Sequence, residues 1–200
     1  MKLKLTALGV VLTLAGCAST IDIQDEQQNN LVDTNKPVYT LVNLHPDATR
    51  AKLFSLNYQQ GGFIPRCTEV DIHSATTKLM EFTIKETGQT YLYYWHKRTP
   101  DFAQNIQKYF GTSCEPLSAS LSDIDRQGIS SGKAQIGMTK AAVIQAMGYP
   151  PVFRTPKPMA TQTWVYWTNR WNTMTVTFDT DGKVSNVNYP TSSSDGIRLF

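Results

Sequence analysis

Residues 68–96 read TEVDIHSATTKLMEFTIKETGQTYLYYWH, and three stretches within them alternate apolar and polar side chains. The stretches are residues 68–73, 78–85 and 90–96. A period of two is typical of strands that bury one face, so each stretch predicts a β-strand. Thr87-Gly88 is the expected turn between the second and third strands. Together they predict a β-meander.

The residues after the meander carry the signals of a helix. Thr99 can cap its start, Pro100 suits the first helical position, Asp101 favours the positive end, and Gly111 can adopt the left-handed conformation beyond its end. Four apolar residues between them fall on one helical face: Phe102, Ile106, Tyr109 and Phe110. We expect this helix to pack on the meander.

Polar segments and breaks predict how the chain is divided. Residues 18–36 are polar and poor in aromatics, which predicts a flexible tether with a reach of roughly 25 Å. Residues 48–58 are expected to form a short helix starting near Asp47. The predicted organisation is a signal peptide (1–16), a lipidated cysteine with its tether (17–36), an N-terminal α+β domain (37–117), a linker that has room for one short helix (118–132), a second domain (133–190) and a tail (191–200).

The C-terminal part carries a second set of clear boundaries. Thr139 can cap a helix over residues 140–147, and Gly148 stops it ahead of two prolines. Three further strands are expected, over residues 161–168, 173–178 and 183–189. Asp181-Gly182 suits a tight turn between the last two strands.

These residues resemble the SmpA/OmlA (BamE-like) lipoprotein domain, whose pattern runs Gly-Met-Thr, helix, Leu-Gly-x-Pro, Trp-x-Tyr, a strand ending in Phe, and Gly-Lys-Val. The matching residues are 136–139, Val143, 147–150, 164–167, 176–178 and 182–184. The resemblance implies a helix packed on a three-stranded antiparallel sheet, with Trp164, Tyr166 and Phe178 in its core. The expected fold class is therefore α+β, with two small domains: an N-terminal β-meander with a helix, and this BamE-like domain.

The first residues resemble a lipoprotein signal. Lys2 and Lys4 precede an apolar run, residues 5–15, that is too short for a permanent membrane span. The run ends in Leu-Ala-Gly-Cys, which resembles a lipobox and predicts cleavage before Cys17 and lipidation of its thiol. The alternatives are an ordinary signal peptide with a cysteine near the cleavage point, or a thiol buried in a core. Ala18, in place of Asp, favours the outer membrane by analogy, with the protein facing the periplasm.

Two cysteines remain after Cys17, in a compartment that oxidises thiols. We expect Cys67 and Cys114 to form a disulfide, and two separate buried thiols are the alternative. A metal site is less favoured, because His73 and His96 are not at ligand spacing from these cysteines. No metal and no cofactor is predicted.

Charge and motifs limit the function. Removing the signal peptide lowers the formal charge from +3 to +1, which argues against nucleic acid as a partner. The chain has no HExxH helix or phosphate loop, and its histidines are His45, His73 and His96.

We therefore expect a non-enzymatic outer-membrane lipoprotein that serves envelope assembly or scaffolds a multi-protein complex, with other envelope proteins as partners. An envelope enzyme is a less favoured class. A second alternative is a ligand- or peptidoglycan-binding lipoprotein that uses the aromatic run Tyr91, Tyr93, Tyr94 and Trp95. A third open point is whether Trp164, Trp167 and Trp171 form a docking patch or pack in the core.

Overall fold

The structure is a computed structural model that describes residues 20–189. Residues in strands and isolated β-bridges make up 31% of the described chain, and helix residues 15%. The strands are β1 (Val38–Thr40), β2 (Lys52–Phe54), β3 (Glu69–Ala75), β4 (Leu79–Ile84), β5 (Thr90–Tyr94), β6 (Phe110–Gly111), β7 (Thr163–Trp167), β8 (Thr173–Phe178) and β9 (Val184–Asn188). The helices are α1 (Phe102–Gln107), α2 (Asp123–Ser131), α3 (Lys140–Met147) and a short 3-10 helix (Pro158–Ala160).

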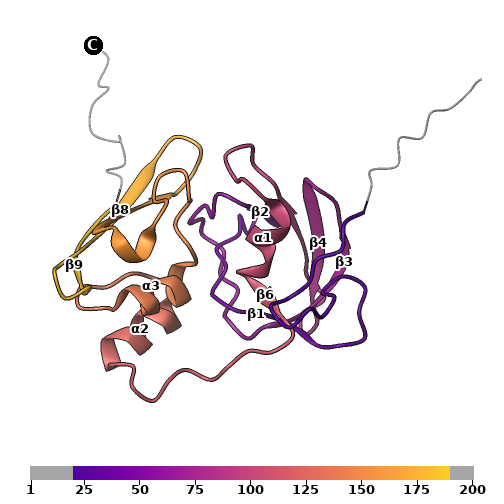
Figure 1. The fold of residues 1–200 in the computed structure, drawn as a ribbon, viewed down its shortest axis with the longest axis horizontal. Coiled ribbons are helices and arrows are strands. Elements are labelled where there is room, and N and C mark those ends of the chain that lie inside the picture. Colours follow the sequence, from indigo (N-terminus) through magenta and orange to yellow (C-terminus); the bar gives the residue numbers. More distant parts are fainter. Residues whose placement is uncertain (1–19, 190–200) are drawn as a thin grey trace, which may run out of the picture.

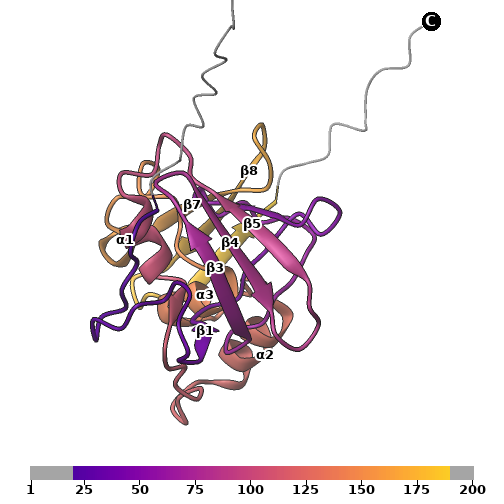
Figure 2. The same ribbon diagram turned by 90° about the vertical axis from the view of Figure 1, so that its right-hand side faces the viewer.

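The first lobe, residues 20–111, is built on a curled six-stranded sheet (Figure 1, Figure 2). Its strand order is β2-β5-β4-β3-β1-β6, and β2 runs parallel to β5 while the other neighbours are antiparallel. Alternate strand residues such as Met80 and Phe82 are fully buried, and they share a core with Phe102 and Ile106 of α1. The alternation follows from strand geometry, because successive side chains point to opposite faces.

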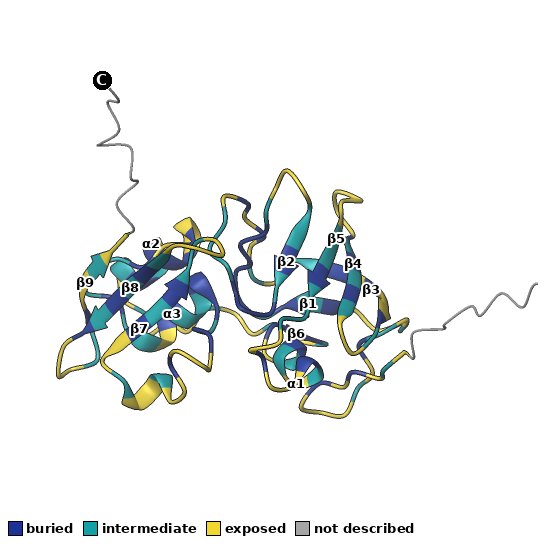
Figure 3. Cartoon of the chain, turned by 90° about the horizontal axis from the view of Figure 1, so that it is seen from above, coloured by how far each residue is buried: buried dark blue, intermediate teal, exposed yellow. Residues whose placement is uncertain are grey.

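The second lobe, residues 123–189, holds a separate three-stranded antiparallel sheet in the order β7-β8-β9. Trp164 and Tyr166 of β7 are fully buried, and they share one core with Val143 of α3 and Ile129 of α2. Figure 3 shows these buried residues, in dark blue, on the strands and on α3. The connection between the lobes passes along the outside of the molecule before it enters α2 (Figure 1).

The predicted fold class is wrong. We expected α+β, with an N-terminal β-meander and a helix followed by a helix packed on a three-stranded sheet. The structure is mostly sheet, with a curled mixed sheet of six strands and a separate sheet of three. The extra strands β1, β2 and β6 have only two or three residues each, too few for an alternating pattern to reveal them.

The predicted tether is also wrong for residues 20–36. Ile23 and Leu31 are fully buried in the core of the first lobe. Between them the chain makes a tight loop, closed by a hydrogen bond of 2.8 Å from the Leu31 amide to the Ile23 carbonyl. The polar composition of the segment reflects its exposed loop residues and hides the two apolar side chains that fix it to the core.

Several boundaries need correction. The expected linker, residues 118–132, contains α2, whose Ile129 is buried, so the short helix expected inside it is confirmed but the segment is not a free linker. Residues 48–58 form no helix and contain β2. Helix α1 is capped by Asp101 rather than Thr99, and it ends before Gly111, which lies in β6.

Other elements are confirmed. Strands β3, β4, β5, β7, β8 and β9 lie within two residues of the predicted stretches. Helix α3 spans residues 140–147 as predicted. The Thr139 hydroxyl accepts a hydrogen bond from the Ala142 amide, and the helix stops at Gly148.

The two lobes are joined through the C-terminal end of α3. The last carbonyls of a helix have no partner within it. Here first-lobe side chains supply the donors: Asn57 Nδ2 donates to the carbonyl oxygens of Met147 (2.7 Å) and Tyr149 (2.9 Å), and Asn43 Nδ2 donates to Ala146 O (3.2 Å). Gly148 permits this approach, because a Cβ there would lie 2.9 Å from Asn57 Nδ2.

Candidate functional site

The described chain begins against the first lobe. Thr20 forms a β-bridge with Thr76, and the Ile21 amide donates to the Ala75 carbonyl at 2.9 Å. Cys17, the predicted lipidation site, lies outside the described residues. A chain of three residues spans at most about 11 Å. Any group attached to Cys17 is therefore close to the Thr20 end of the first lobe.

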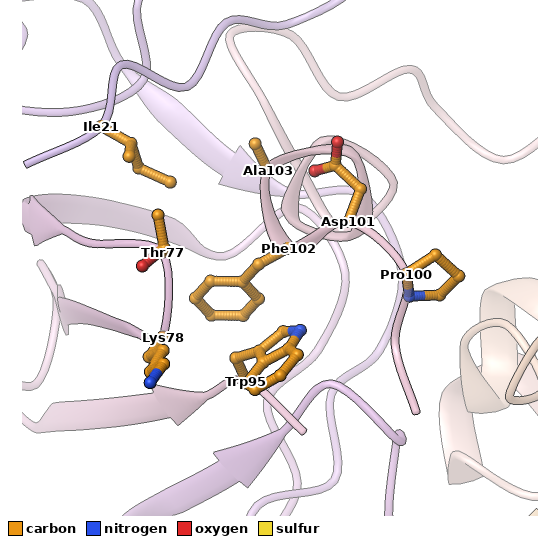
Figure 4. Close-up of a pocket in the computed structure, with 8 residues that line it drawn as sticks. All are labelled: Ile21, Thr77, Lys78, Trp95, Pro100, Asp101, Phe102 and Ala103. Carbon is orange, nitrogen blue, oxygen red and sulfur yellow. The ribbon is translucent and has the colours of Figure 1, made fainter. Parts of the chain in front are cut away.

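An apolar pocket of about 440 Å³ opens at this end of the molecule (Figure 4). Trp95 and Phe102 form its floor, Ile21 closes one side, and Ala103 lies on the side formed by α1. Phe102 occupies this position because Asp101 starts the helix, with its carboxylate accepting a hydrogen bond from the Gln104 amide at 3.0 Å. The pocket thus combines the N-terminal segment, the end of β5 and the first turn of α1.

A second candidate surface lies where the two lobes meet. Tyr58 forms a parallel β-bridge with Trp167, and the two residues line a small pocket of about 160 Å³. The Phe153 ring stacks on Trp167 with centroids 6.3 Å apart, and the Arg98 guanidinium lies 4.8 Å from the Phe153 centroid. We call this surface the junction patch, and define it as Tyr58, His96, Lys97, Arg98, Phe153, Trp167, Arg170 and Trp171.

The junction patch is positively charged. In the described part of the chain, no carboxylate lies within 4.0 Å of Lys97, Arg98 or Arg170, since the salt bridges there involve only Arg50 and Lys85. Burial lowers the pKa of His96, and the nearby Arg98 and Lys97 lower it further. His96 is therefore mainly neutral at pH 7, and the positive charge comes from the lysine and the arginines.

The junction patch also exposes aromatic surface. Trp171 is 75% exposed and lies under the Arg170 guanidinium, which is 4.6 Å from its ring centroid. Trp167 Nε1 is buried without a hydrogen-bond partner in the described structure. Aromatic side chains and arginines are the residue types that contribute most to protein interfaces. This arrangement suits the binding of an acidic surface.

The predicted disulfide is confirmed. Cys67 and Cys114 are bonded, with their Cα atoms 5.4 Å apart. The bond ties the start of the connection between the lobes to the loop before β3. Among residues 20–189, no group of three or more His, Cys, Asp or Glu side chains is placed to hold a metal ion.

The three histidines lie in different surroundings. His45 is buried, and its Nε2 donates to Ala146 O at 2.9 Å, so it belongs to the joint between the lobes. Burial lowers its pKa, and the hydrogen bond partly offsets this. His73 is exposed beside the Thr83 hydroxyl, and His96 lines the junction pocket. The structure does not bring them together.

The aromatic run of β5 is divided between core and surface. Tyr93 is buried, and its hydroxyl donates to Asn105 Oδ1 at 2.7 Å. Tyr91 stacks on Phe82, and Tyr94 stacks on Phe54. The run therefore provides sheet packing, and only Trp95 lines the apolar pocket.

The tryptophans divide in the same way: Trp164 packs in the core, whereas Trp167 and Trp171 belong to the junction patch. Sequence reasoning missed Arg98, Phe153 and Arg170, which complete that patch. It also missed Ile21 and Phe102 as pocket walls. These residues are distant in the chain, and no spacing signal connects them.

Comparisons with models of protein families, with curated proteins and with solved structures found no match to this chain. Among residues 20–189, no helix has the length and apolar character needed to cross a bilayer.

Proposed function

We propose that this chain is a lipid-anchored lipoprotein of the bacterial outer membrane that faces the periplasm. In this proposal it acts as a non-enzymatic binding component of a multi-protein envelope complex. The observation that carries the proposal is the short distance between the lipobox-like cysteine and the folded body. Cys17 is three residues from Thr20, which already pairs with Thr76. Lipid on Cys17 would hold the first lobe directly against the membrane surface.

The junction patch is the surface that we assign to the partner. It combines exposed Trp171 and Phe153 with two arginines that have no carboxylate partner in the described chain. The complementary partner is an envelope protein with a cluster of acidic side chains. The resemblance of residues 136–184 to the SmpA/OmlA (BamE-like) lipoproteins also favours a role in envelope assembly.

The anchor is tested by metabolic labelling with a fatty acid. We expect label on the wild-type protein and none on Cys17→Ser, and we expect the labelled protein to fractionate with the outer membrane. Equal labelling of the two proteins, or a wild type without label, would contradict the anchor.

The partner surface is tested with a photo-crosslinking amino acid at position 171 in the anchored protein, and with the same group at position 86 as a control. Glu86 lies in the exposed turn between β4 and β5. We expect one defined adduct from position 171 and none from position 86. Arg98→Glu with Arg170→Glu should abolish the adduct, whereas Lys133→Glu, an exposed charge reversal outside the patch, should keep it. An adduct insensitive to the arginine reversals would rule out the junction patch as the docking site.

A further inference from the structure

The apolar pocket beside Ile21 suits a ligand that is mainly hydrocarbon, because the polar groups of Trp95 and Asp101 in its lining are already paired. Trp95 Nε1 donates to the Thr99 carbonyl at 2.9 Å, and the Asp101 carboxylate accepts from the Gln104 amide at 3.0 Å. None of the buried polar atoms that lack a partner in the described chain belongs to a residue of this pocket. The other polar side chains of the lining, Thr77 and Lys78, belong to exposed residues, so an apolar ligand in the pocket would cover exposed carbon without burying an unpaired polar atom.

The size of the pocket corresponds to one long hydrocarbon chain. A protein cavity of about 150 Å³ holds a benzene ring, which has six carbon atoms. In the same proportion, a pocket of about 440 Å³ has room for roughly 18 carbon atoms. That is the length of a single acyl chain. The pocket is too small for both chains of a phospholipid.

The position of the pocket identifies the source of such a chain. Ile21 forms part of its wall and is four residues from Cys17, so at most about 14 Å of chain separates the two. This inference rests on the proposed function for its location at a membrane surface. The half-thickness of the hydrocarbon core of a bilayer is about 15 Å. A pocket held this close to the anchor lies within reach of membrane lipids.

We propose that the pocket binds one acyl chain of a membrane phospholipid. Trp95 and Phe102 contact the chain, and the aliphatic part of Lys78 borders it where it enters from the membrane (Figure 4). Bound lipid would orient the first lobe on the membrane.

The test uses a lysophospholipid with bromine atoms on its single 16-carbon chain, added below its micelle concentration. The protein is the chain without residues 1–16 and with Cys17→Ser, which keeps every described residue. Bromine quenches tryptophan fluorescence on contact. We expect saturable quenching with one lipid per protein. Trp95→Phe, which keeps the apolar wall, should remove the quenching, because Trp164, Trp167 and Trp171 are in the second lobe.

A matched pair of variants on α1 tests the pocket itself. Ala103→Phe places a ring in the pocket, whereas Gln104→Phe places the same ring on the exposed side of the helix. We expect Ala103→Phe to weaken binding at least tenfold and Gln104→Phe to change it less than twofold. Circular dichroism and the thermal midpoint check that both variants fold. Quenching that does not saturate, persists in Trp95→Phe, or is equal in the two α1 variants would overturn the proposal.

A comparison with the lipidated wild type identifies the occupant. We expect the lipidated protein to bind the added lysophospholipid as the Cys17→Ser protein does. If only the Cys17→Ser protein binds it, the chain on Cys17 itself fills the pocket, and the membrane phospholipid is excluded as occupant. Because lysophospholipid binding is measured without the anchor, its failure would leave the fatty-acid labelling of Cys17 unaffected, and failed labelling would leave the pocket measurement valid.

Discussion

Asp25 connects the N-terminal segment to Thr112, which directly follows β6 and is far away in the sequence. Its carboxylate accepts hydrogen bonds from the Asn29 amide at 2.8 Å and from the Thr112 hydroxyl. Burial alone would raise the pKa of Asp25, but the hydrogen bonds from Thr112 and Asn29 outweigh it and lower the pKa from 3.8 to about 2. The residue thus fixes the loop between Ile23 and Leu31 onto the end of β6.

This lowered pKa predicts how stability depends on pH. Because the folded pKa is below the unfolded value of 3.8, the Asp25 carboxylate stabilises the folded state above that pH, and the contribution is lost as the pH falls toward about 2. We expect Asp25→Asn to lower the free energy of unfolding at pH 7 by about 1.5–3 kcal/mol, the usual contribution of hydrogen bonds to a charged group.

Urea unfolding of both proteins between pH 7 and pH 2 provides the measurement. The difference between wild type and Asp25→Asn should be constant down to about pH 4 and should shrink below it, in the range between the two pKa values. Other carboxylates titrate in both proteins and cancel in the difference. A difference that stays constant down to pH 2 would show that Asp25 has an ordinary pKa.

At the scale of elements, a single carboxylate caps two helices. Asp125 Oδ2 accepts from the Ser122 backbone amide at 3.3 Å, which completes the capping box of α2, and also from the Ser122 hydroxyl at 2.8 Å. Its Oδ1 accepts from the Thr139 backbone amide at 2.7 Å at the start of α3. Burial would raise the pKa of Asp125, and the hydrogen bonds from Thr139 and Ser122 outweigh it, so that the pKa is lowered. The residue stays ionised where two helix N-termini meet.

We therefore expect Asp125→Asn to destabilise the second lobe by about 2–3 kcal/mol. The side-chain NH₂ of the asparagine would face an N–H or O–H group that now donates to the carboxylate, which weakens both caps. Asp123→Asn is the matched control, because Asp123 is exposed in the same first turn and loses the same charge. Its expected cost is at most about 1 kcal/mol, from the helix dipole alone. Equal losses in urea unfolding of the two variants would contradict the bridging role.

The elements also show how far the sequence alone determines this fold. Strand alternation located six of the nine strands, and Thr139 and Gly148 located α3, because these signals are local. Strand β2 could not be found in this way: its three residues are held by parallel pairing with β5, about forty positions away. The candidate surfaces were hidden for the same reason, since each combines residues from distant segments.

At the scale of the whole molecule, the two lobes are joined by buried hydrogen bonds as well as by the connecting chain. Asn43 is 1% exposed and contacts both helices of the second lobe. Its side-chain Nδ2 donates to Ile129 O of α2 at 2.6 Å, and its backbone N–H donates to Gln145 O of α3 at 2.9 Å. Separating the lobes would leave these carbonyls and Asn43 without partners, at a cost of about 1–3 kcal/mol for each buried group. The two lobes should therefore unfold as one cooperative unit.

Reduction of the disulfide tests this cooperation. The loop that Cys67 and Cys114 close separates them by 47 positions, so the chain-entropy model predicts that reduction destabilises the protein by about 4 kcal/mol. The loop lies entirely before the second lobe. If the lobes unfold together, reduction must lower the urea midpoint reported by Trp164, Trp167 and Trp171 in a Trp95→Phe background, although none of these tryptophans lies in the loop. The far-ultraviolet circular dichroism midpoint should fall by the same amount. An unchanged fluorescence midpoint, with a second transition at lower urea, would mean that the lobes unfold independently and that the hydrogen bonds to the end of α3 do not couple them.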